Sequence, residues 1–311
     1  MSKQHGFESL LLSNSSSIKI RNPQAVLTKI QKIKSDAFSK LMFISDFDAT
    51  MSKHHTASAP EIRLPSTFGV IEQSTGLPPS AQKICEDNYK NYYPKEMDLT
   101  IPADEKLKLM IEWWTSSQNA MVAANVITEK IIIDAVKKSD VCLRDDTDKL
   151  LKFCNESEIP FLVFSAGCGD IISNMLKHKE PVCWTEKNMV LISNMLGFDE
   201  ETGILKEFKA PLIHTLNKKN FVKHVKEFQA ENSAHVDGLV KGRNNIILMG
   251  DHLGDVNMKC GMEDINECLN IGFINYKIKE NLETYMDTFD VVLVNDETMD
   301  FPNQLMEYLK Q

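Results

Sequence analysis

The sequence predicts an α/β protein with a doubly wound, mostly parallel sheet and an inserted helical cap domain. Three apolar runs, residues 41–44, 161–164 and 246–249, lack hydrophobic alternation, so we expect strands that are buried on both faces. Weaker runs at 269–274 and 291–294 add further strands. Helical patterns separate the runs, which is typical of a doubly wound sheet. More than a hundred residues separate the first two strong runs, too many for one crossover, so the insertion falls there.

The chain before the first strand has two parts. Residues 1–17 are polar and rich in serine, and we expect them to form a flexible N-terminal arm. Asn22 and Pro23 are typical of an N-cap and a first helical residue, and apolar residues follow at helical spacing as far as Ile33. This second part is therefore predicted to be a helix that lies on the core.

The insertion is predicted to form the helical cap domain over residues 53–139, between core segments 18–52 and 140–311. Its beginning, within residues 52–79, contains four prolines and two histidines, which indicates an irregular connection. A helical pattern follows to about Ser139. The clearest part is one stripe of a long amphipathic helix, formed by Leu107, Met110, Ile111, Trp114 and Met121.

Composition and charge exclude several classes of protein. The 311 residues are 42% hydrophobic and 25% charged, which is typical of a globular protein of two domains or of one large domain with an insertion. Lys and Arg number 35 against 44 Asp and Glu, and the net charge of −9 argues against nucleic acid or anionic membranes as partners. The seven cysteines include no CxxC pair, which is typical of reduced thiols. The sequence also shows no signal-peptide pattern and no apolar run near the length of a membrane span, about 18 residues. These observations predict a cytoplasmic protein.

Two carboxylates follow the first apolar run. Asp46 and Asp48 stand one residue apart, so both can face the mouth of the sheet once the chain leaves extended geometry. Like charges this close repel unless a proton or a cation relieves them, and Mg²⁺ is the usual cation beside phosphate. Asp-x-Asp is also common in surface turns, so this pair alone leaves both a turn and a metal site open.

The next two elements are weak when taken singly. Ser165, Ala166 and Gly167 follow the second run, where a hydroxyl and backbone N–H groups that open a helix can donate to phosphate oxygens. A serine at an N-cap is also an ordinary structural feature. Lys218 could neutralise a transferring phosphoryl group, but Lys219 competes for the role and most lysines are solvated at the surface.

The third strong run is followed by a second pair of carboxylates. Gly250 allows the backbone to approach a ligand closely, and Asp251 and Asp255 are four residues apart. A helix that begins between them would turn both carboxylates toward one metal ion. The four elements occur in a fixed order after apolar runs, and chance is a poor explanation for that combination.

In this order, the four elements resemble the signature of the haloacid dehalogenase superfamily of phosphatases: DxDx(T/V), a Ser or Thr, a Lys, and GDxxxD. A closer resemblance, from about Ile18 to about Leu309, is to the cytosolic 5′-nucleotidase III family, which includes pyrimidine and 7-methylguanosine phosphate-specific nucleotidases. It is carried by residues 112–115 (EWWT), 164–170 (FSAGCGD), 212–218 (LIHTLNK) and 245–251 (NIILMGD). The resemblance implies a haloacid dehalogenase-like core with a cap, and it selects Lys218 over Lys219.

The resemblance also implies a Mg²⁺-dependent 5′-nucleotidase that hydrolyses nucleoside 5′-monophosphates in two steps. Asp46 would be the nucleophile and form an aspartyl-phosphate, and Asp48 would protonate the leaving 5′-oxygen and then activate water. Asp46, the backbone carbonyl of Asp48 and Asp251 would hold Mg²⁺, with Asp255 close to these ligands. The phosphate-binding residues would be Ser165, Ala166 and Lys218.

Base recognition, by the same resemblance, lies in the cap. Glu96 matches the base-binding glutamate of the family and could accept from an exocyclic amine of cytosine or guanine, and Ser117 matches a nucleotide-contact position. Trp113-Trp114 resembles the 7-methylguanosine phosphate-specific branch, in which an aromatic wall stacks on a cationic base. Burial of Trp114 in the cap core is the alternative. The choice between a pyrimidine and 7-methylguanine stays open.

The sequence differs from the family pattern at two places, and two other functions stay open. His252 stands where the family usually has Ser, and residues 54–75 do not match its usual loop. The same machinery could act on another small phosphate such as a sugar phosphate, or the chain could be a non-catalytic nucleotide-binding relative. Degenerate relatives normally lose a carboxylate or the lysine, whereas this chain has all of them. We expect a monomer.

Overall fold

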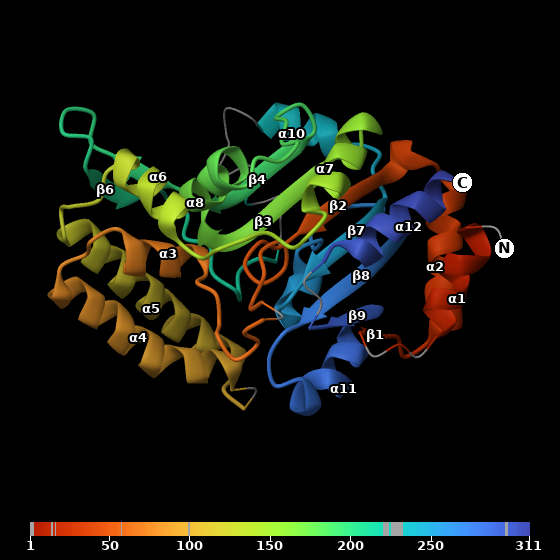
Figure 1. Cartoon of the computed structure of the whole chain (residues 1–311), viewed down its shortest axis with the longest axis horizontal. Helices are drawn as coiled ribbons and strands as arrows, with labels where there is room; N and C mark the ends of the chain where they lie inside the picture. Colours follow the sequence, from red (N-terminus) through yellow and green to blue (C-terminus); the bar gives the residue numbers. More distant parts are fainter. Residues whose placement is uncertain are drawn as a thin grey trace.

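Seven of the strands form one sheet in the order β1-β9-β8-β7-β2-β3-β4 (Figure 1). Neighbouring strands run parallel except β1 and β9, so the prediction of a doubly wound, mostly parallel sheet is confirmed. The computed structural model describes residues 3–13, 15, 17–56, 58–98, 100–219, 224, 233–295 and 298–311. The strands are β1 (Ile18–Lys19), β2 (Leu41–Ser45), β3 (Phe161–Cys168), β4 (Met189–Asn194), β7 (Asn245–Gly250), β8 (Glu267–Ile274) and β9 (Val291–Val294).

The apolar runs form strands because each has a buried layer on both sides. In β2, Leu41 and Phe43 belong to one cluster of buried side chains, and Met42 and Ile44 belong to another. Successive side chains point to opposite faces of a strand, so an unbroken apolar run is buried only between two layers. β2 lies between β7 and β3, where the winding of the chain reverses, and ligands bind at this position in open α/β sheets.

Helices pack around the sheet, and both termini lie at one end of the molecule (Figure 1). The predicted start of α2 is confirmed, because the Asn22 side chain accepts the N–H of Ala25 and Pro23 is the first helical residue. The core helices are α1 (Lys3–Leu12), α2 (Pro23–Ser35), α7 (Thr147–Glu156), α8 (Gly169–Asn174), α10 (Ser233–Val240), α11 (Ile278–Thr288) and α12 (Asp300–Lys310), with short turns η1 (Phe38–Lys40), η2 (Met175–Lys179) and η3 (Leu253–Asn257).

The N-terminal segment differs from the expected flexible arm over residues 1–17, since Lys3–Leu12 form helix α1. Phe7 packs against Tyr308 of α12 with ring centroids 5.0 Å apart, and Leu11 is buried one turn later. Two apolar residues four positions apart give this otherwise polar segment one face that packs on the core. The average composition of the segment hides that face.

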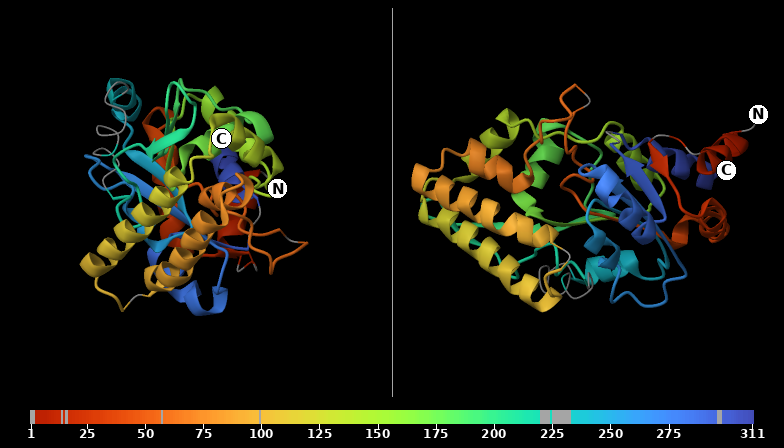
Figure 2. Two further views of the ribbon diagram at one scale, coloured as in Figure 1. Left: turned by 90° about the vertical axis from the view of Figure 1, so that its left-hand side faces the viewer. Right: turned by 90° about the horizontal axis from the view of Figure 1, so that it is seen from below.

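The predicted cap range contains four helices: α3 (Thr67–Ser74), α4 (Pro79–Met97), α5 (Ala103–Ala123) and α6 (Glu129–Lys138). α4 and α5 lie side by side at the end of the molecule opposite the termini (Figure 2). α6 packs on α8, and the hairpin of β5 (Leu196–Phe198) and β6 (Leu205–Phe208) packs on α5. The elements on either side of residue 139 therefore interleave in space.

The long helix expected around residues 107–121 is α5, but its buried face differs from the expected stripe. Met110 and Met121 are fully buried, whereas Leu107 and Ile111 are 37% and 45% exposed. The buried face includes Lys106 instead, whose Nζ donates to the backbone carbonyl of Glu96 at 3.0 Å. A lysine can bury its aliphatic stem when its ammonium has a partner, and a pattern of apolar residues does not reveal this.

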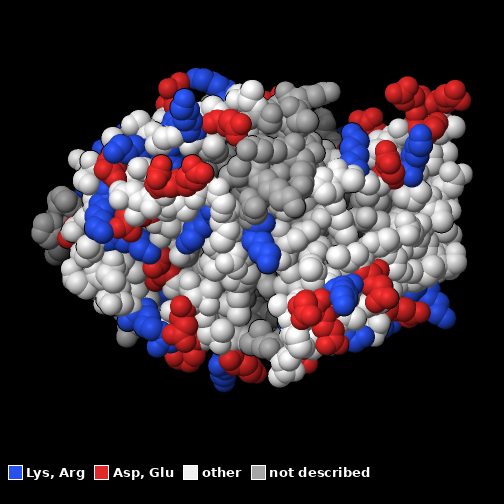
Figure 3. Space-filling view, turned by 180° about the vertical axis from the view of Figure 1, so that it is seen from behind, with Lys and Arg blue, Asp and Glu red and all other residues white. Residues whose placement is uncertain are grey.

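None of the helices in the described part of the chain is long and apolar enough to cross a membrane. On the face seen in Figure 3, the Lys and Arg side chains of the described residues alternate with Asp and Glu and form no broad basic patch.

Candidate active site

The predicted site residues meet at the C-terminal edge of three adjacent strands. Asp46 follows β2, Ser165 lies in β3 and Asp251 follows β7, so parallel neighbours deliver these side chains to one place. A cavity of about 520 Å³ opens at this edge. Its lining includes Asp46, Asp48, Glu96, Trp114, Ser117, Ser165, Ala166, Lys218 and Asp251.

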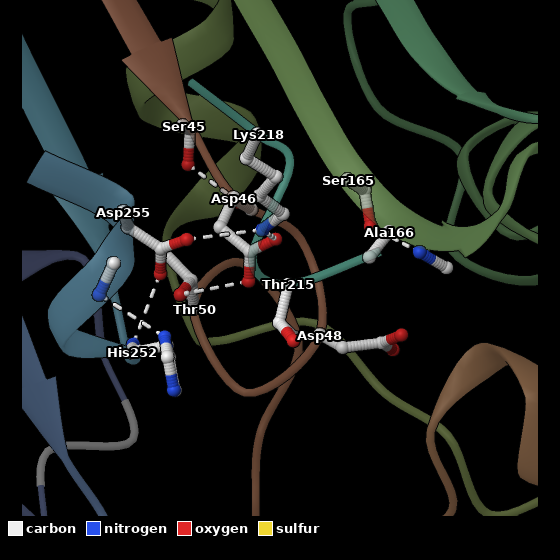
Figure 4. A network of polar contacts seen from close by, with 12 residues as sticks. Ser45, Asp46, Asp48, Thr50, Ser165, Ala166, Thr215, Lys218, His252 and Asp255 are labelled. Atoms are coloured by element: carbon white, nitrogen blue, oxygen red, sulfur yellow. Dashed lines mark hydrogen bonds and ion pairs between the residues drawn. The ribbon is translucent and has the colours of Figure 1, made fainter. Parts of the chain in front are cut away.

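Three aspartates lie close to one lysine at this cavity, and Asp46, Asp251 and the lysine, Lys218, line it. Asp46, Asp251 and Asp255 each bring a carboxylate oxygen within 4.8 Å of the others. The buried Lys218 donates through Nζ to Asp46 Oδ1 and, at 3.1 Å, to Asp255 Oδ1 (Figure 4). The second oxygen of Asp255 accepts the backbone N–H of His252 at 2.9 Å. Both oxygens of Asp255 are therefore engaged, whereas the Asp251 carboxylate has no hydrogen bond to any described residue.

Burial and mutual repulsion leave the cluster short of positive charge. Burial raises the pKa of Asp46 to about 7, with Lys218 opposing the rise and Asp255 adding to it. Burial, followed by the charges of Asp46 and Asp255, also raises the pKa of Asp251 well above its ordinary value. A single lysine does not neutralise three carboxylates, so the cluster favours either bound protons or a further cation.

The arrangement of these oxygens fits a small divalent cation. Mg²⁺ binds oxygen ligands at about 2.0–2.1 Å in an octahedron, so oxygens on opposite sides of the ion lie about 4 Å apart. One carboxylate oxygen from each of the three aspartates lies within 4.8 Å of the other two, which is close to this separation. Over the described ranges of the chain, this is the one cluster of three or more His, Cys, Asp or Glu able to hold a metal ion.

Asp48 points away from the acidic cluster toward helix α3 (Figure 4). The Thr67 N–H donates to Asp48 Oδ1 at 2.9 Å, and the Thr67 hydroxyl donates to Oδ2 at 2.7 Å. That hydroxyl accepts the N–H of Cys168 at 2.9 Å, so its one proton is directed to Asp48. Burial raises the pKa of Asp48, and the hydrogen bonds from Thr67 oppose the rise. Gly167 leaves room for this contact, because a Cβ there would lie 2.2 Å from Thr67 Oγ1.

The two segments predicted to bind phosphate are joined by Asn194, which ends β4. Its Nδ2 donates to the carbonyls of Ala166 at 2.7 Å and Ile213 at 2.8 Å, and its Oδ1 accepts the N–H of Ile213 at 2.9 Å. Asn194 is buried, so these bonds are shielded from water. Ser165 and Lys218 therefore enter the cavity from two backbone segments that one side chain holds together.

The three predicted base-binding residues reach the same cavity from α4 and α5. Trp114 packs edge-on against Phe68 of α3, with ring centroids 4.8 Å apart. Its indole Nε1 is buried and has no hydrogen-bond partner among the described residues. Ser117 accepts from the Asn88 side chain at 3.0 Å, and Glu96 Oε1 accepts from the Thr215 hydroxyl at 2.5 Å. Trp114 is thus half-buried against the core and also lines the cavity.

Comparison with known proteins identifies the family. The profile of the family described as pyrimidine 5′-nucleotidase (UMPH-1) matches residues 49–310. The chain belongs to this family. The 7-methylguanosine phosphate-specific 5′-nucleotidase of Gallus gallus is 34% identical to it over 294 residues, which cover 94% of this chain and 96% of the relative. This family member is therefore a 5′-nucleotidase, a phosphoric monoester hydrolase.

Solved structures agree with the fold of this nucleotidase. The crystal structure of cytosolic 5′-nucleotidase IIIB bound to cytidine aligns with a TM-score of 0.81 at 30% identity, covering 99% of this chain and 97% of that chain. A probable phosphoserine phosphatase from Vibrio cholerae aligns with a TM-score of 0.51 at 10% identity, covering 88% of this chain and 66% of that chain, and shares the fold alone. Both alignments agree with the predicted α/β core.

Three residues that support the site of this nucleotidase were not predicted: Thr67, Asn194 and Arg144. Arg144 is buried and donates to the backbone carbonyls of Thr50 and Ala49, both at 2.7 Å. Ala49 has a φ of +59°, so Arg144 holds a left-handed turn directly after Asp48. Asn194 is a polar residue at the end of an apolar strand. The same pattern identifies Asp46, so it could also have identified Asn194.

The two departures from the family pattern have structural roles in this nucleotidase. His252 Nδ1 accepts the N–H of Gly254 at 3.0 Å, the role that a serine hydroxyl performs at an N-cap, so the histidine preserves the turn that carries Asp255. The divergent residues 54–75 provide α3 and with it Thr67, which contacts Asp48. Ser66 caps this helix by accepting the N–H of Gly69 at 3.2 Å.

Thr67→Val is expected to lower kcat by about 10- to 100-fold with little change in KM. Valine has nearly the shape of threonine but loses the donor to Asp48 Oδ2. If Asp48 is the acid and base that the sequence predicts, a small displacement of its carboxylate is enough for a loss of this size. Steady-state kinetics with Thr67→Ser as the matched control, which keeps the hydroxyl, measures the effect. A wild-type kcat in Thr67→Val would show that the hydroxyl does not position Asp48.

Proposed function

We propose that this 5′-nucleotidase is Mg²⁺-dependent and hydrolyses nucleoside 5′-monophosphates through an aspartyl-phosphate on Asp46. The observation that carries the proposal is the cluster of Asp46, Asp251 and Asp255 at the mouth of the sheet, where Lys218 pairs with the buried Asp46 and Asp255. Asp46, Asp251 and the backbone carbonyl of Asp48 would hold the ion, and Asp255 would steady Lys218 beside them. When bound, Mg²⁺ would offset the negative charge that the phosphate and the carboxylates bring together.

The proposed reaction has two halves, and side chains of the cavity take part in both. In the first, Asp46 Oδ attacks phosphorus as the bond to the nucleoside 5′-oxygen breaks, and Asp48 gives that oxygen its proton. In the second, Asp48 takes a proton from water, which attacks phosphorus, releases phosphate and regenerates the Asp46 carboxylate. Ser165, the backbone of Ala166 and Lys218 bind the phosphate oxygens. Burial favours the protonated form of Asp48 that the first half requires, and the contacts from Thr67 favour the ionised form that the second half requires.

The base is proposed to lie against Glu96, Trp114 and Ser117. Glu96 accepts from an exocyclic amine, Trp114 stacks on the ring and Ser117 contacts the nucleotide. Two comparisons support an amine-bearing base: the similar Gallus gallus enzyme is named for 7-methylguanosine phosphate, and the similar cytosolic 5′-nucleotidase IIIB was solved with cytidine. Cytosine and guanine both carry such an amine, so the proposed substrates are cytidine and 7-methylguanosine 5′-monophosphates.

Phosphate release from CMP, 7-methyl-GMP, UMP and ribose 5-phosphate in saturating Mg²⁺ tests the proposal. We expect kcat/KM for CMP or 7-methyl-GMP to exceed that for ribose 5-phosphate at least about tenfold, because a buried charge-assisted hydrogen bond and stacking on Trp114 act only on a base. Equal values for all four substrates would favour a general phosphatase of small phosphate esters. Tight nucleotide binding without phosphate release would favour the non-catalytic relative.

We also propose a role for the cap, a monomeric state and a cytoplasmic location. Residues 53–139 would act as a cap that excludes water from the cavity, since Glu96 and Trp114 line the same cavity as Asp46. One chain supplies all of these residues, which supports a monomer acting on a small nucleotide rather than on nucleic acid or at a membrane. The name cytosolic 5′-nucleotidase IIIB, carried by the similar solved structure, supports a cytoplasmic location.

A further inference from the structure

A hydrogen bond connects the base-binding and phosphate-binding ends of the cavity. Glu96, at the end of α4, is 9% exposed, and its Oε1 accepts from the Thr215 hydroxyl at 2.5 Å. Thr215 lies three residues before Lys218 in the segment 212–218, and both residues line the cavity. One short segment of the core thus carries the cation of the phosphate site and the hydrogen-bond donor to the carboxylate of the base site.

The backbone that carries Thr215 is fixed before any ligand binds. Asn194 holds both the N–H and the carbonyl of Ile213, at 2.9 and 2.8 Å. Asn217 closes the same segment, accepting from the His214 N–H and donating to the Leu212 carbonyl, both at 2.8 Å. The hydroxyl of Thr215 is therefore presented from a rigid turn.

The backbone that carries Glu96 is fixed as well. Lys106 is 7% exposed, and its Nζ donates to the Glu96 carbonyl at 3.0 Å, which ties the end of α4 to the start of α5. The Thr215 hydroxyl has one proton, and a carboxylate has about four acceptor sites. Glu96 Oε2 accepts no hydrogen bond from the described residues, so its lone pairs stay available to a ligand.

We propose that Thr215 is a specificity-determining positioning residue: it orients the Glu96 carboxylate toward the exocyclic amine of the base and sets its distance from the phosphate-binding Lys218. This inference rests on the proposed function. A carboxylate that is held by one donor loses little freedom when it accepts a second, and a charge-assisted hydrogen bond of this kind is strong and directional. A substrate without the amine gains nothing from this arrangement, and a substrate without a base does not meet it.

Thr215→Val, Thr215→Ser and Glu96→Gln, assayed with CMP, UMP and ribose 5-phosphate, test the proposal. In Thr215→Val we expect kcat/KM for CMP to fall about tenfold, about 1.4 kcal/mol, mainly through KM. The values for UMP, which has no exocyclic amine, and for ribose 5-phosphate stay within about twofold of wild type. Thr215→Ser keeps the donor and is expected to retain the CMP to UMP ratio of the wild type. In a Glu96→Gln background, Thr215→Val is expected to have no further effect on that ratio.

The outcomes separate this inference from the proposed function. If wild-type protein releases phosphate from nucleotides and Thr215→Val slows all three substrates equally or none of them, the positioning role is overturned and the proposed function stands. Full additivity of Thr215→Val and Glu96→Gln would overturn it in the same way. If wild-type protein releases phosphate from no nucleotide, the proposed function and this inference fall together. Cytidine affinity, measured by tryptophan fluorescence, is expected to weaken in Thr215→Val and not in Thr215→Ser, which gives a readout independent of turnover.

Discussion

Asp46→Asn is expected to slow phosphate release at least about 10³-fold while leaving the fold intact. Asparagine matches aspartate in size, and its amide oxygen can still accept from Lys218, so the packing at the end of β2 is preserved. The amide oxygen is a poor nucleophile, however, and no aspartyl-phosphate can form. Phosphate release and the midpoint of chemical unfolding, measured on the same preparation, separate the two effects.

Asp134→Asn is the matched control for this substitution. Asp134 lies on α6, where it pairs with Lys130 at 2.8 Å across exposed side chains. An exposed pair of this kind contributes little to stability, so turnover and unfolding midpoint are both expected to stay at wild-type values. Near-normal phosphate release by Asp46→Asn, with Asp134→Asn unchanged, would rule out Asp46 as the nucleophile.

Removal of divalent cations is expected to abolish turnover. It is also expected to reveal a contribution to the free energy of unfolding that falls as pH rises. Burial raises the pKa of Asp46 from 3.8 to about 7 and raises that of Asp251 as well. Between these pH values the two aspartates bind more protons in the folded protein than in the unfolded chain, so their contribution to the free energy of unfolding falls as pH rises from about 4 to about 7. The proposed Mg²⁺ would bind the ionised carboxylates of the folded state, so it is expected to oppose this loss.

Urea unfolding at pH 5.0 and pH 7.5, in chelator and in Mg²⁺, measures this linkage, and phosphate release under the same conditions measures the activity. Asp251→Asn is the informative variant, because the Asp251 carboxylate has no hydrogen bond to a described residue and the substitution disturbs little else. It is expected to raise the Mg²⁺ concentration for half-maximal turnover at least about tenfold. Full turnover in excess chelator, or the same pH dependence of stability in chelated wild type and chelated Asp251→Asn, would contradict the proposed metal site.

The sheet and its motifs could be predicted because the signals are local. A run such as Leu41–Ile44 marks a strand buried on both faces, and the polar residues that follow such runs are delivered by parallel pairing to one edge. Asp46 and Asp251 meet for this reason. Their proximity follows from the pairing of the strands alone, without knowledge of any contact between distant side chains.

The supporting contacts could not be predicted because they join segments that no local pattern relates. Thr67 reaches Asp48 across 19 residues, and Arg144 reaches the carbonyl of Thr50 across 94 residues. Lys106 is buried in α5 because its ammonium finds a carbonyl of α4, so the expected apolar stripe of α5 was misplaced. In each case the partner is a backbone group or a carboxylate whose position depends on the completed fold.

The Asn194 side chain gives the active site a mechanical property. It is the shared anchor of the chain at Ala166 and at Ile213, so a displacement of either segment is transmitted to the other. Thermal fluctuations would then shift the hydroxyl of Ser165 and the ammonium of Lys218 in concert and preserve the spacing between them. A substitution at position 194 would uncouple these movements, and turnover would decline although every group that touches the substrate was still present.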